Sequence, residues 1–285
     1  MRDGSAAPAP RVVCVTGGKG GVGKSNFSLN FGLALAERGR RVLLVDGDAG
    51  LGNLDVLLGL VPARHLGHVL QGACRPAEAL AHGPLGVDLL PAASGLAAMG
   101  STPPAAALAD VVEELALGYD LLVLDAGAGL GADVQACLRA ADEAVVVTTP
   151  EPPALADAYA TLKALGRGHR LGRVWLVVNM AEGPQDAERA ARAVLSVCRT
   201  YLGWAPAPLG WLPRDPAVAR AVREQRPFLL APGAPPAARA MRGVAAAFCQ
   251  DLDDHAPPTA RRGLREICLA LLGRGGVALR GERMF

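Results

Sequence analysis

The sequence predicts an α/β protein built on a single doubly wound domain, with a mainly parallel sheet and helices on both faces. Short apolar runs alternate with longer helical patterns, which is typical of strand–helix–strand units. The runs are apolar at successive positions and not at every second one, as in strands buried on both faces. The 285 residues, 51% of them hydrophobic, suffice for one large domain of this kind.

The first elements surround a glycine-rich turn. After a leader over residues 1–10 that we expect to be disordered, the run RVVCVT predicts a strand over 11–16. A largely buried helix is predicted over 25–38, with Gly39 as the residue that stops it. A second strand is predicted over 41–45. The same alternation continues along the chain. Further strands are expected at 87–90, 121–124, 144–148 and 174–178, and further helices at 63–71, 105–117, 132–141, 155–165 and 185–201.

The composition limits the domain organisation and the kinds of partner. One domain is expected over residues 11–250, followed by an acidic, proline-containing linker over 251–260 and a basic tail over 261–285.

The net charge of +2 argues against binding nucleic acid by bulk charge alone. The leader has no apolar stretch of a signal peptide, and no apolar run reaches the roughly 18–20 residues of a membrane span. The six cysteines form no CxxC pair, so we expect reduced thiols in a cytoplasmic protein.

The glycine-rich turn carries the phosphate-binding motif G-x-x-x-x-G-K-[ST] between a predicted strand and a predicted helix, which is the context that this motif requires. Glycines let backbone N–H groups converge on phosphate oxygens, and the helix N-terminus adds its dipole. Lys24 is expected to reach the β- and γ-phosphates, and Ser25 to ligate Mg²⁺. An ordinary glycine-rich turn is the alternative. The motif comprises Gly18, Lys19, Gly20, Gly21, Val22, Gly23, Lys24 and Ser25.

Acidic residues follow two of the predicted strands, at the edge of a parallel sheet where ligands bind. Asp46 and Asp48 come after the strand over 41–45, and Asp125 ends the apolar run LLVLD, a Walker B pattern. Such carboxylates can hold Mg²⁺ through water or orient an attacking water molecule. In the simpler alternative they only cap the next turn.

The stretch KGGVGKS, with its second lysine, resembles the deviant Walker A motif of the MinD/ParA family of P-loop ATPases. This resemblance implies that Lys19 reaches across an ATP-bound homodimer to the partner's nucleotide, whereas a solvated loop lysine is the alternative. It also implies catalytic roles for Lys24 and for Asp48, which would position the hydrolytic water, and places Asp46 and Asp125 near Mg²⁺. The residues implied at the ATP or ADP itself include Asn26 and Asn179. They also include Pro213, Arg214 and Asp215, which lie in the segment over 210–215 that resembles the family loop packing over the base.

Longer stretches are similar to one branch of this family, the flagellar-number regulators of the FlhG (FleN) type. They include KGGVGKSN, VDGDAGLGNLDVLLGL, TTPEPPALADAYATLKAL and AVREQRPF. The resemblance implies control of flagellar number or placement through an FlhF-type GTPase, a FleQ-type activator or a switch-complex protein. Two positions depart from the family pattern: Ala126 replaces a hydroxyl residue, and Gly47 replaces a residue with a side chain.

The tail predicts attachment to a membrane surface. Residues 261–285 contain six arginines and two glutamates, and their apolar side chains follow a helical stripe. A basic amphipathic helix of this kind is expected to bind the surface of an anionic membrane, here the inner face of the cell membrane. A helix docked on the protein's own surface is the alternative. The stripe consists of Leu264, Ile267, Cys268, Leu271 and Leu272.

Other functions remain as alternatives. A ParA-type partition ATPase would bind DNA non-specifically as an ATP dimer, but the body of the chain is nearly neutral, so DNA binding is not expected. An iron–sulfur carrier is disfavoured because the chain has no CxxC pair and no cysteine in the segment directly after Asp125. A binding module without catalysis is disfavoured by the intact Lys24, Asp48 and Asp125.

Overall fold

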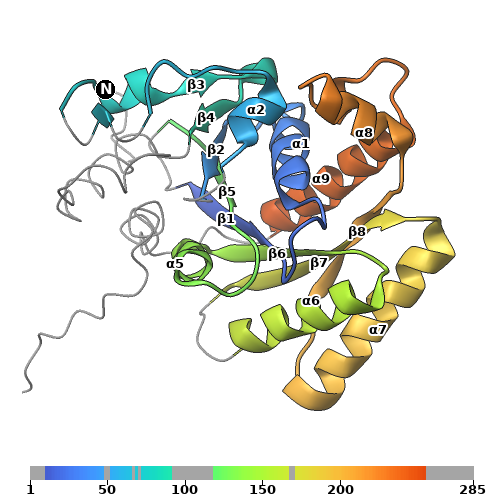
Figure 1. Ribbon diagram of the computed structural model, residues 1–285. Helices are drawn as coiled ribbons and strands as arrows, with labels where there is room; N and C mark the ends of the chain where they lie inside the picture. Colours follow the sequence, from blue (N-terminus) through green and yellow to red (C-terminus); the bar gives the residue numbers. More distant parts are fainter. Residues whose placement is uncertain are drawn as a thin grey trace, which may run out of the picture.

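The computed structural model describes residues 10–47, 52–65, 68–69, 72–91, 118–166 and 171–254. Asp48, the predicted helix over 105–117 and the whole tail over 261–285 lie outside these ranges. Within them, strands and helices form a layered α/β domain (Figure 1), which confirms the predicted fold class.

The described part of the sheet has eight strands in the order β3-β4-β2-β5-β1-β6-β7-β8. All neighbouring pairs are parallel except β3 with β4, which are antiparallel. The strands are β1 (Arg11–Thr16), β2 (Val42–Asp46), β3 (Ala81–His82), β4 (Asp88–Leu90), β5 (Leu121–Asp125), β6 (Glu143–Thr148), β7 (Arg173–Ala181) and β8 (Ala207–Pro213).

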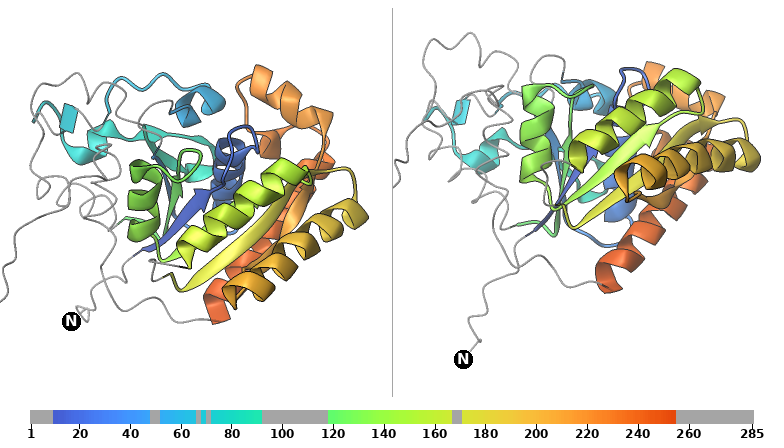
Figure 2. Two further views of the ribbon diagram at one scale, coloured as in Figure 1. Left: turned by 60° about the horizontal axis from the view of Figure 1, so that its bottom comes forward. Right: turned by 90° about the horizontal axis from the view of Figure 1, so that it is seen from below.

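Helices cover both faces of this sheet (Figures 1 and 2). The α-helices are α1 (Lys24–Ala36), α2 (Leu54–Leu58), α5 (Ala132–Ala140), α6 (Pro152–Leu165), α7 (Pro184–Leu202), α8 (Pro216–Arg223) and α9 (Pro236–Asp254). Short 3₁₀ helices are η1 (Pro76–Ala79), η2 (Pro84–Gly86) and η4 (Phe228–Leu230). Among these α-helices, none is both long enough and apolar enough to cross a bilayer.

The strand β1 shows how the sequence builds two core layers. Its side chains alternate between faces, so Val12 and Cys14 pack with α5, α6 and α7, whereas Val13 and Val15 pack with α1 and α9. Every residue of β1 is buried, which is why the run is apolar throughout and shows no alternation with polar residues. Both layers lie against the central strand that leads into the glycine-rich loop.

A buried polar group lies near the opposite, N-terminal end of the strands. The Arg11 guanidinium contacts the Glu143 carboxylate at 3.0 Å (Nη1 to Oε1), and the Trp175 indole N–H donates to the other oxygen of Glu143 at 2.7 Å. Burial raises the pKa of Glu143, while the Trp175 hydrogen bond and the Arg11 charge lower it. All the polar atoms of the Glu143 carboxylate are therefore satisfied inside the protein.

The structure corrects several sequence predictions. The segment Gly210–Pro213, predicted as part of a loop, belongs to β8, and residues 63–65, predicted to begin a helix, are not helical. The helices α2, α8 and α9 and the short strand β3 were not predicted. The predicted linker over 251–260 is wrong for its first four residues because α9 continues to Asp254. This last turn is held by ion pairs from Arg173 to Asp251 and from Arg40 to Asp253.

Candidate functional site

The loop between β1 and α1 is shaped for close approach of the backbone to a ligand. Gly21 and Gly23 have positive φ values of 84° and 87°, which residues other than glycine rarely adopt. At Gly18, an added Cβ would lie 2.3 Å from the backbone oxygen of Asp157 on α6. The loop therefore packs tightly on α6 while its crest, which includes the exposed Gly20, remains open.

Lys24 is the first residue of α1, directly after this loop. Only 8% of it is exposed, and its Nζ donates to the backbone oxygen of Lys19 at 3.2 Å, on the other side of the loop. Ser25, the next residue, is half-buried in the first turn of the helix. The ammonium of Lys24 is thus held inside the curve of the loop, where the sequence predicted phosphate to bind.

Lys19 lies differently, because 44% of its side chain is exposed to solvent. Its Nζ is 3.9 Å from Oε2 of Glu151, whose side chain is 58% exposed. An ion pair this long between exposed groups contributes little to stability. The two lysines of the motif therefore differ in environment: one is enclosed by its own loop, and the other reaches the surface.

The two predicted metal carboxylates are neighbours at the C-terminal edge of the sheet. Asp46 and Asp125 end adjacent parallel strands in matching register, and each is 2% exposed. The backbone N–H of Leu54 donates to Asp46 Oδ2 at 3.1 Å. Two buried carboxylates close to the loop provide the hard oxygen ligands, or the acceptors for metal-bound water, that Mg²⁺ prefers. The arrangement thus suits a magnesium nucleotide; Asp48, the predicted water-positioning residue, lies outside the described residues.

Sequence reasoning missed Ser28, which lies one turn after Ser25 on α1. Its Oγ is 2.7 Å from Asp125 Oδ1 and 3.1 Å from the backbone oxygen of Lys24, and the residue is fully buried. Because the Ser28 hydroxyl contacts the carboxylate directly, it restrains the orientation of Asp125. The available signal was that polar residues (Lys24, Ser25, Asn26, Ser28 and Asn30) recur through the first half of a helix that is otherwise apolar.

We expect Ser28→Ala to weaken Mg²⁺-dependent ATP binding and to lower the free energy of unfolding by about 1–3 kcal/mol, because a buried carboxylate loses a hydrogen bond. Isothermal titration with ATP, in Mg²⁺ and in EDTA, measures the first effect, and urea unfolding measures the second. The loss of affinity should appear in Mg²⁺ alone. An equal loss in EDTA would show that Ser28 acts on the loop and not through Asp125.

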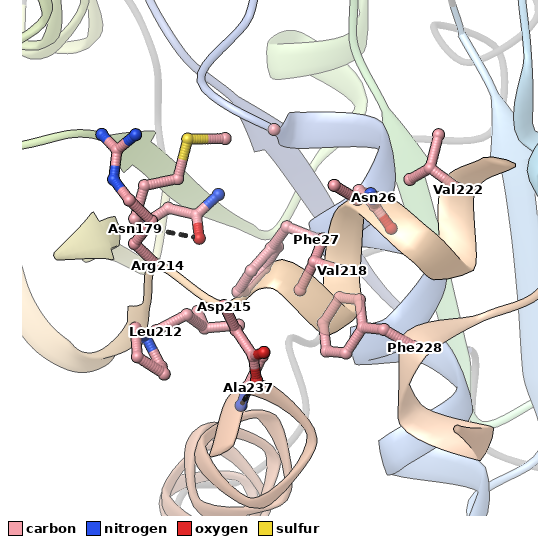
Figure 3. Close-up of a pocket in the computed structure, with 14 residues that line it drawn as sticks. Asn26, Phe27, Asn179, Leu212, Arg214, Asp215, Val218, Val222, Phe228 and Ala237 are labelled. Atoms are coloured by element: carbon pink, nitrogen blue, oxygen red, sulfur yellow. Dashed lines mark hydrogen bonds between the residues drawn. The ribbon is translucent and has the colours of Figure 1, made fainter. Parts of the chain in front are cut away.

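Beside the loop lies a pocket of about 360 Å³ with mostly apolar walls (Figure 3). It is bounded by the loop and α1 on one side, by the end of β7, and by the segment from β8 through α8 to α9. An apolar pocket with a few polar groups suits an aromatic base. The lining residues are Gly23, Asn26, Phe27, Asn179, Met180, Leu212, Pro213, Arg214, Asp215, Val218, Ala219, Val222, Phe228 and Ala237.

Asn179, near the end of β7, is fixed against the loop. Its Nδ2 donates to the backbone oxygen of Val22 at 2.8 Å, and its Oδ1 accepts from the backbone N–H of Met180 at 2.9 Å. The strand end and the phosphate-binding motif are therefore joined by one side chain at the pocket wall. The remaining N–H and the remaining oxygen lone pair of this amide can each serve a base.

The predicted base-loop residues lie at the same pocket, but two of them have structural contacts. Arg214 pairs with Glu182 at 2.8 Å (Nε to Oε1). One oxygen of Asp215 accepts from the N–H of Ala217 at 2.9 Å and caps α8, and the other accepts from the N–H of Ala237 at 3.0 Å. The Asp215 carboxylate thus joins the first turns of α8 and α9, while Pro213 precedes both residues at the end of β8.

The two departures from the family pattern have structural reasons. At Gly47 an added Cβ would lie 2.9 Å from Cys137 Sγ and 3.0 Å from the backbone oxygen of Asp125. The N–H of Gly47 donates to that same oxygen at 3.0 Å, which ties the end of β2 to β5. Ala126 is 1% exposed and belongs to the apolar core layer with α5. Both positions therefore accommodate close packing behind the carboxylates.

We expect Gly23→Ala to weaken nucleotide binding by at least about tenfold, because the new Cβ would lie 2.5 Å from Asn179 Nδ2 at a φ of 87°. A non-glycine residue held in this backbone region costs about 1–3 kcal/mol. Fluorescence titration with a labelled ATP measures the effect. Gly243→Ala is the control, since an added Cβ there meets nothing within 4 Å. Equal affinities in wild type and Gly23→Ala would contradict the close packing of loop and amide.

The sequence model of the CobQ/CobB/MinD/ParA nucleotide binding domain matches residues 13–228. The chain belongs to this family. Antiactivator FleN of Pseudomonas aeruginosa is 43% identical over 225 residues, which are 78% of this chain and 80% of FleN. Flagellum site-determining protein YlxH of Helicobacter pylori is 34% identical over 76% of this chain and 74% of YlxH. The family assignment confirms the predicted MinD/ParA-type P-loop ATPase that uses ATP and Mg²⁺.

Solved structures of the family agree with the fold. The septum site-determining protein MinD of Pyrococcus horikoshii, complexed with Mg-ADP, superposes with a TM-score of 0.71 at 25% identity, over 87% of this chain and 100% of that one. Cell division ATPase MinD of Pyrococcus furiosus gives a TM-score of 0.70 at 27% identity, over 84% of this chain and 98% of that one. The described sheet, loop and pocket therefore form a MinD-like ATPase domain.

Proposed function

We propose that this chain is a MinD-like ATPase that dimerises on ATP, associates with the cytoplasmic face of the cell membrane, and controls the number or placement of flagella. The observation that carries the proposal is the contrast between the two lysines of the loop. Lys24 is enclosed by its own loop, whereas the side chain of Lys19 is 44% exposed and its Nζ lies 3.9 Å from Glu151. An exposed lysine at the mouth of a phosphate site is available to a second copy of the chain.

The chemistry proposed for the site is transfer of the γ-phosphoryl group to water. Lys24 would offset the charge that builds on the phosphate oxygens, and Lys19 would do so from the partner chain. Asp125 and Asp46 would hold Mg²⁺ through water, with Ser25 as a direct ligand, and bound Mg²⁺ would neutralise part of the phosphate charge. Asp48 would orient the attacking water. The apolar pocket with Asn26 and Asn179 would hold the base.

The proposed cellular role rests on the two flagellar relatives. One is named an antiactivator and the other a flagellum site-determining protein. A protein that switches between monomer and dimer can present a binding surface in one nucleotide state only. The proposed recipients of this signal are an FlhF-type GTPase, a FleQ-type activator or a protein of the flagellar switch complex.

Membrane association is proposed for the tail over 261–285. A single short amphipathic helix binds weakly, and two copies in a dimer bind more tightly through avidity. ATP would therefore control attachment by controlling dimerisation.

Co-sedimentation with anionic vesicles tests the switch. The full chain should pellet in Mg-ATP and remain in the supernatant in Mg-ADP. Two full-length variants serve as matched controls: Lys19→Ala, which should fail to dimerise, and Leu264→Asp with Leu271→Asp, which should dimerise without pelleting. Absence of pelleting in ATP, together with ATP-dependent retention of plasmid DNA on a filter, would contradict the membrane role and favour a partition ATPase.

A further inference from the structure

A buried amide network connects α1 to the pocket wall. We infer that Asn30 is a positioning residue that fixes the side-chain amide of Asn26 with its donor end available to the bound nucleoside. This inference rests on the proposed nucleotide site and assigns a specific contact within it. Asn30 lies on α1 one turn after Asn26, and it is fully buried, whereas Asn26 is half-buried and lines the pocket.

Two backbone groups fix the orientation of the Asn30 amide. The N–H of Leu229 in η4 donates to Asn30 Oδ1 at 2.9 Å, and Asn30 Nδ2 donates to the backbone oxygen of Asn26 at 2.7 Å. A backbone N–H can only donate, and a backbone carbonyl can only accept. Exchanging the oxygen and nitrogen of Asn30 would break both bonds, so this amide has one satisfied orientation.

The orientation of Asn26 follows from that of Asn30. Asn30 Nδ2 also donates to Asn26 Oδ1, with 3.1 Å between the nitrogen and the oxygen. Asn26 must therefore present its oxygen to Asn30, which leaves its NH₂ group for other partners. Figure 3 shows the Asn26 side chain at the pocket wall between Phe27 and Val222. The pocket thus receives a hydrogen-bond donor at this position, suited to an acceptor such as a ring nitrogen of the base or a ribose oxygen.

Asn30 also holds a second part of the pocket wall. Its contact with Leu229 anchors η4, and the adjacent Phe228 lines the pocket. The backbone oxygen of Leu229 accepts from Arg242 of α9 at 3.1 Å, and Arg242 forms two hydrogen bonds with Glu37 at 2.7 and 2.9 Å. The aromatic wall and the amide donor are therefore aligned by the same buried side chain.

The test is a double-mutant cycle on the full chain, with N-methylanthraniloyl-ATP as the fluorescent probe. Asn30→Asp keeps an acceptor for the Leu229 N–H but removes the amide donors to Asn26. We expect it to weaken probe binding about tenfold, and Asn26→Leu to do the same. In the Asn26→Leu background, Asn30→Asp should change the affinity less than twofold, because its effect passes through Asn26. Independent, additive effects would overturn the inference.

The inhibition constant of inorganic triphosphate, measured by displacement of the probe, separates a lost nucleoside contact from damage to the whole site. General damage would weaken the binding of triphosphate as well. Triphosphate has no nucleoside, so Asn30→Asp should leave its inhibition constant unchanged. A parallel loss of triphosphate affinity would mean that Asn30 only supports the loop. If Asn30→Asp does not fold, Asn26→Leu alone decides: wild-type probe affinity in that variant overturns the inference.

Glu143→Gln is the control for lost stability, because it alters a buried polar group near the other end of the strands. It should bind the probe like wild type. Failure of the wild-type chain to bind the probe in Mg²⁺ would contradict the proposed function and the inference together. Wild-type binding without coupling between positions 26 and 30 would contradict the inference alone.

Discussion

We expect Lys24→Ala to lower ATP turnover by about two to three orders of magnitude while leaving the fold intact. Removing one preorganised charge-stabilising group from a site of this kind costs about 10²–10³ in rate. The Lys24 ammonium is enclosed by the loop and contacts the Lys19 carbonyl, whereas the side chain of Lys19 is exposed. Steady-state release of phosphate, measured on the full chain, checks the prediction.

The companion variant is Lys24→Arg, which keeps the charge. A planar guanidinium is larger than an ammonium and has a different hydrogen-bond geometry, so we expect it to rescue little of the turnover. Circular dichroism should show the same thermal transition for wild type and Lys24→Arg to within a few degrees. Turnover in Lys24→Ala within threefold of wild type would refute the assigned role.

The second large effect is expected on stability, from Arg11→Ala. This change leaves the Glu143 carboxylate buried without its charged partner, and breaking a buried pair in this way costs about 3–5 kcal/mol. Urea unfolding measures the free energy. The double variant Arg11→Ala with Glu143→Gln should recover most of the loss, because a neutral amide oxygen can still accept from the Trp175 indole. A loss below about 1 kcal/mol in the single variant would contradict the importance of this pair.

The loss should also depend on pH in a defined direction. Burial raises the pKa of Glu143 in the folded state above its unfolded value of about 4.3. At pH values between the unfolded and the folded pKa, the folded state therefore binds more protons than the unfolded state. The contribution of Glu143 to the free energy of unfolding therefore falls as the pH rises through that window. Arg11 lowers the pKa of Glu143, so removing Arg11 raises that pKa further. The destabilisation of Arg11→Ala should accordingly be smaller at pH 5 than at pH 8, and a larger deficit at pH 5 would contradict this account.

The sequence was sufficient for the elements that are buried on both faces. The run over 11–16 coincides with β1, and the runs near 121–124 and 144–148 differ from β5 and β6 by one residue. The strand β8 was missed because Pro208 and Gly210 interrupt its apolar residues and resemble a turn. An edge strand tolerates both, since one side of its backbone has no partner strand.

Two helices that were not predicted, α8 and α9, begin at signals that the sequence contains. Asp215 with Pro216 is an N-cap followed by proline at the first helical position, and α8 starts there. Pro236 likewise begins α9, whose residues Met241, Val244 and Phe248 pack on the core.

The candidate site was predicted where chemistry depends on a contiguous motif. The loop of residues 18–25 and the carboxylates Asp46 and Asp125 lie together as the alternation of strands and helices required. Ser28 and Asn30 were not predicted, because their roles depend on Asp125 and Leu229, which are distant in sequence. Only the packing of α1 against β5 and η4 brings these groups within hydrogen-bond distance.

The most direct test of the central claim is the mass of the full chain by sedimentation velocity in Mg-ATP and in Mg-ADP. The proposed function predicts a dimer in ATP, a monomer in ADP, and a monomer in both for Lys19→Ala. A mass that does not depend on the nucleotide, or a Lys19→Ala variant that dimerises like wild type, would contradict an ATP-driven switch in which the exposed lysine acts on the partner chain.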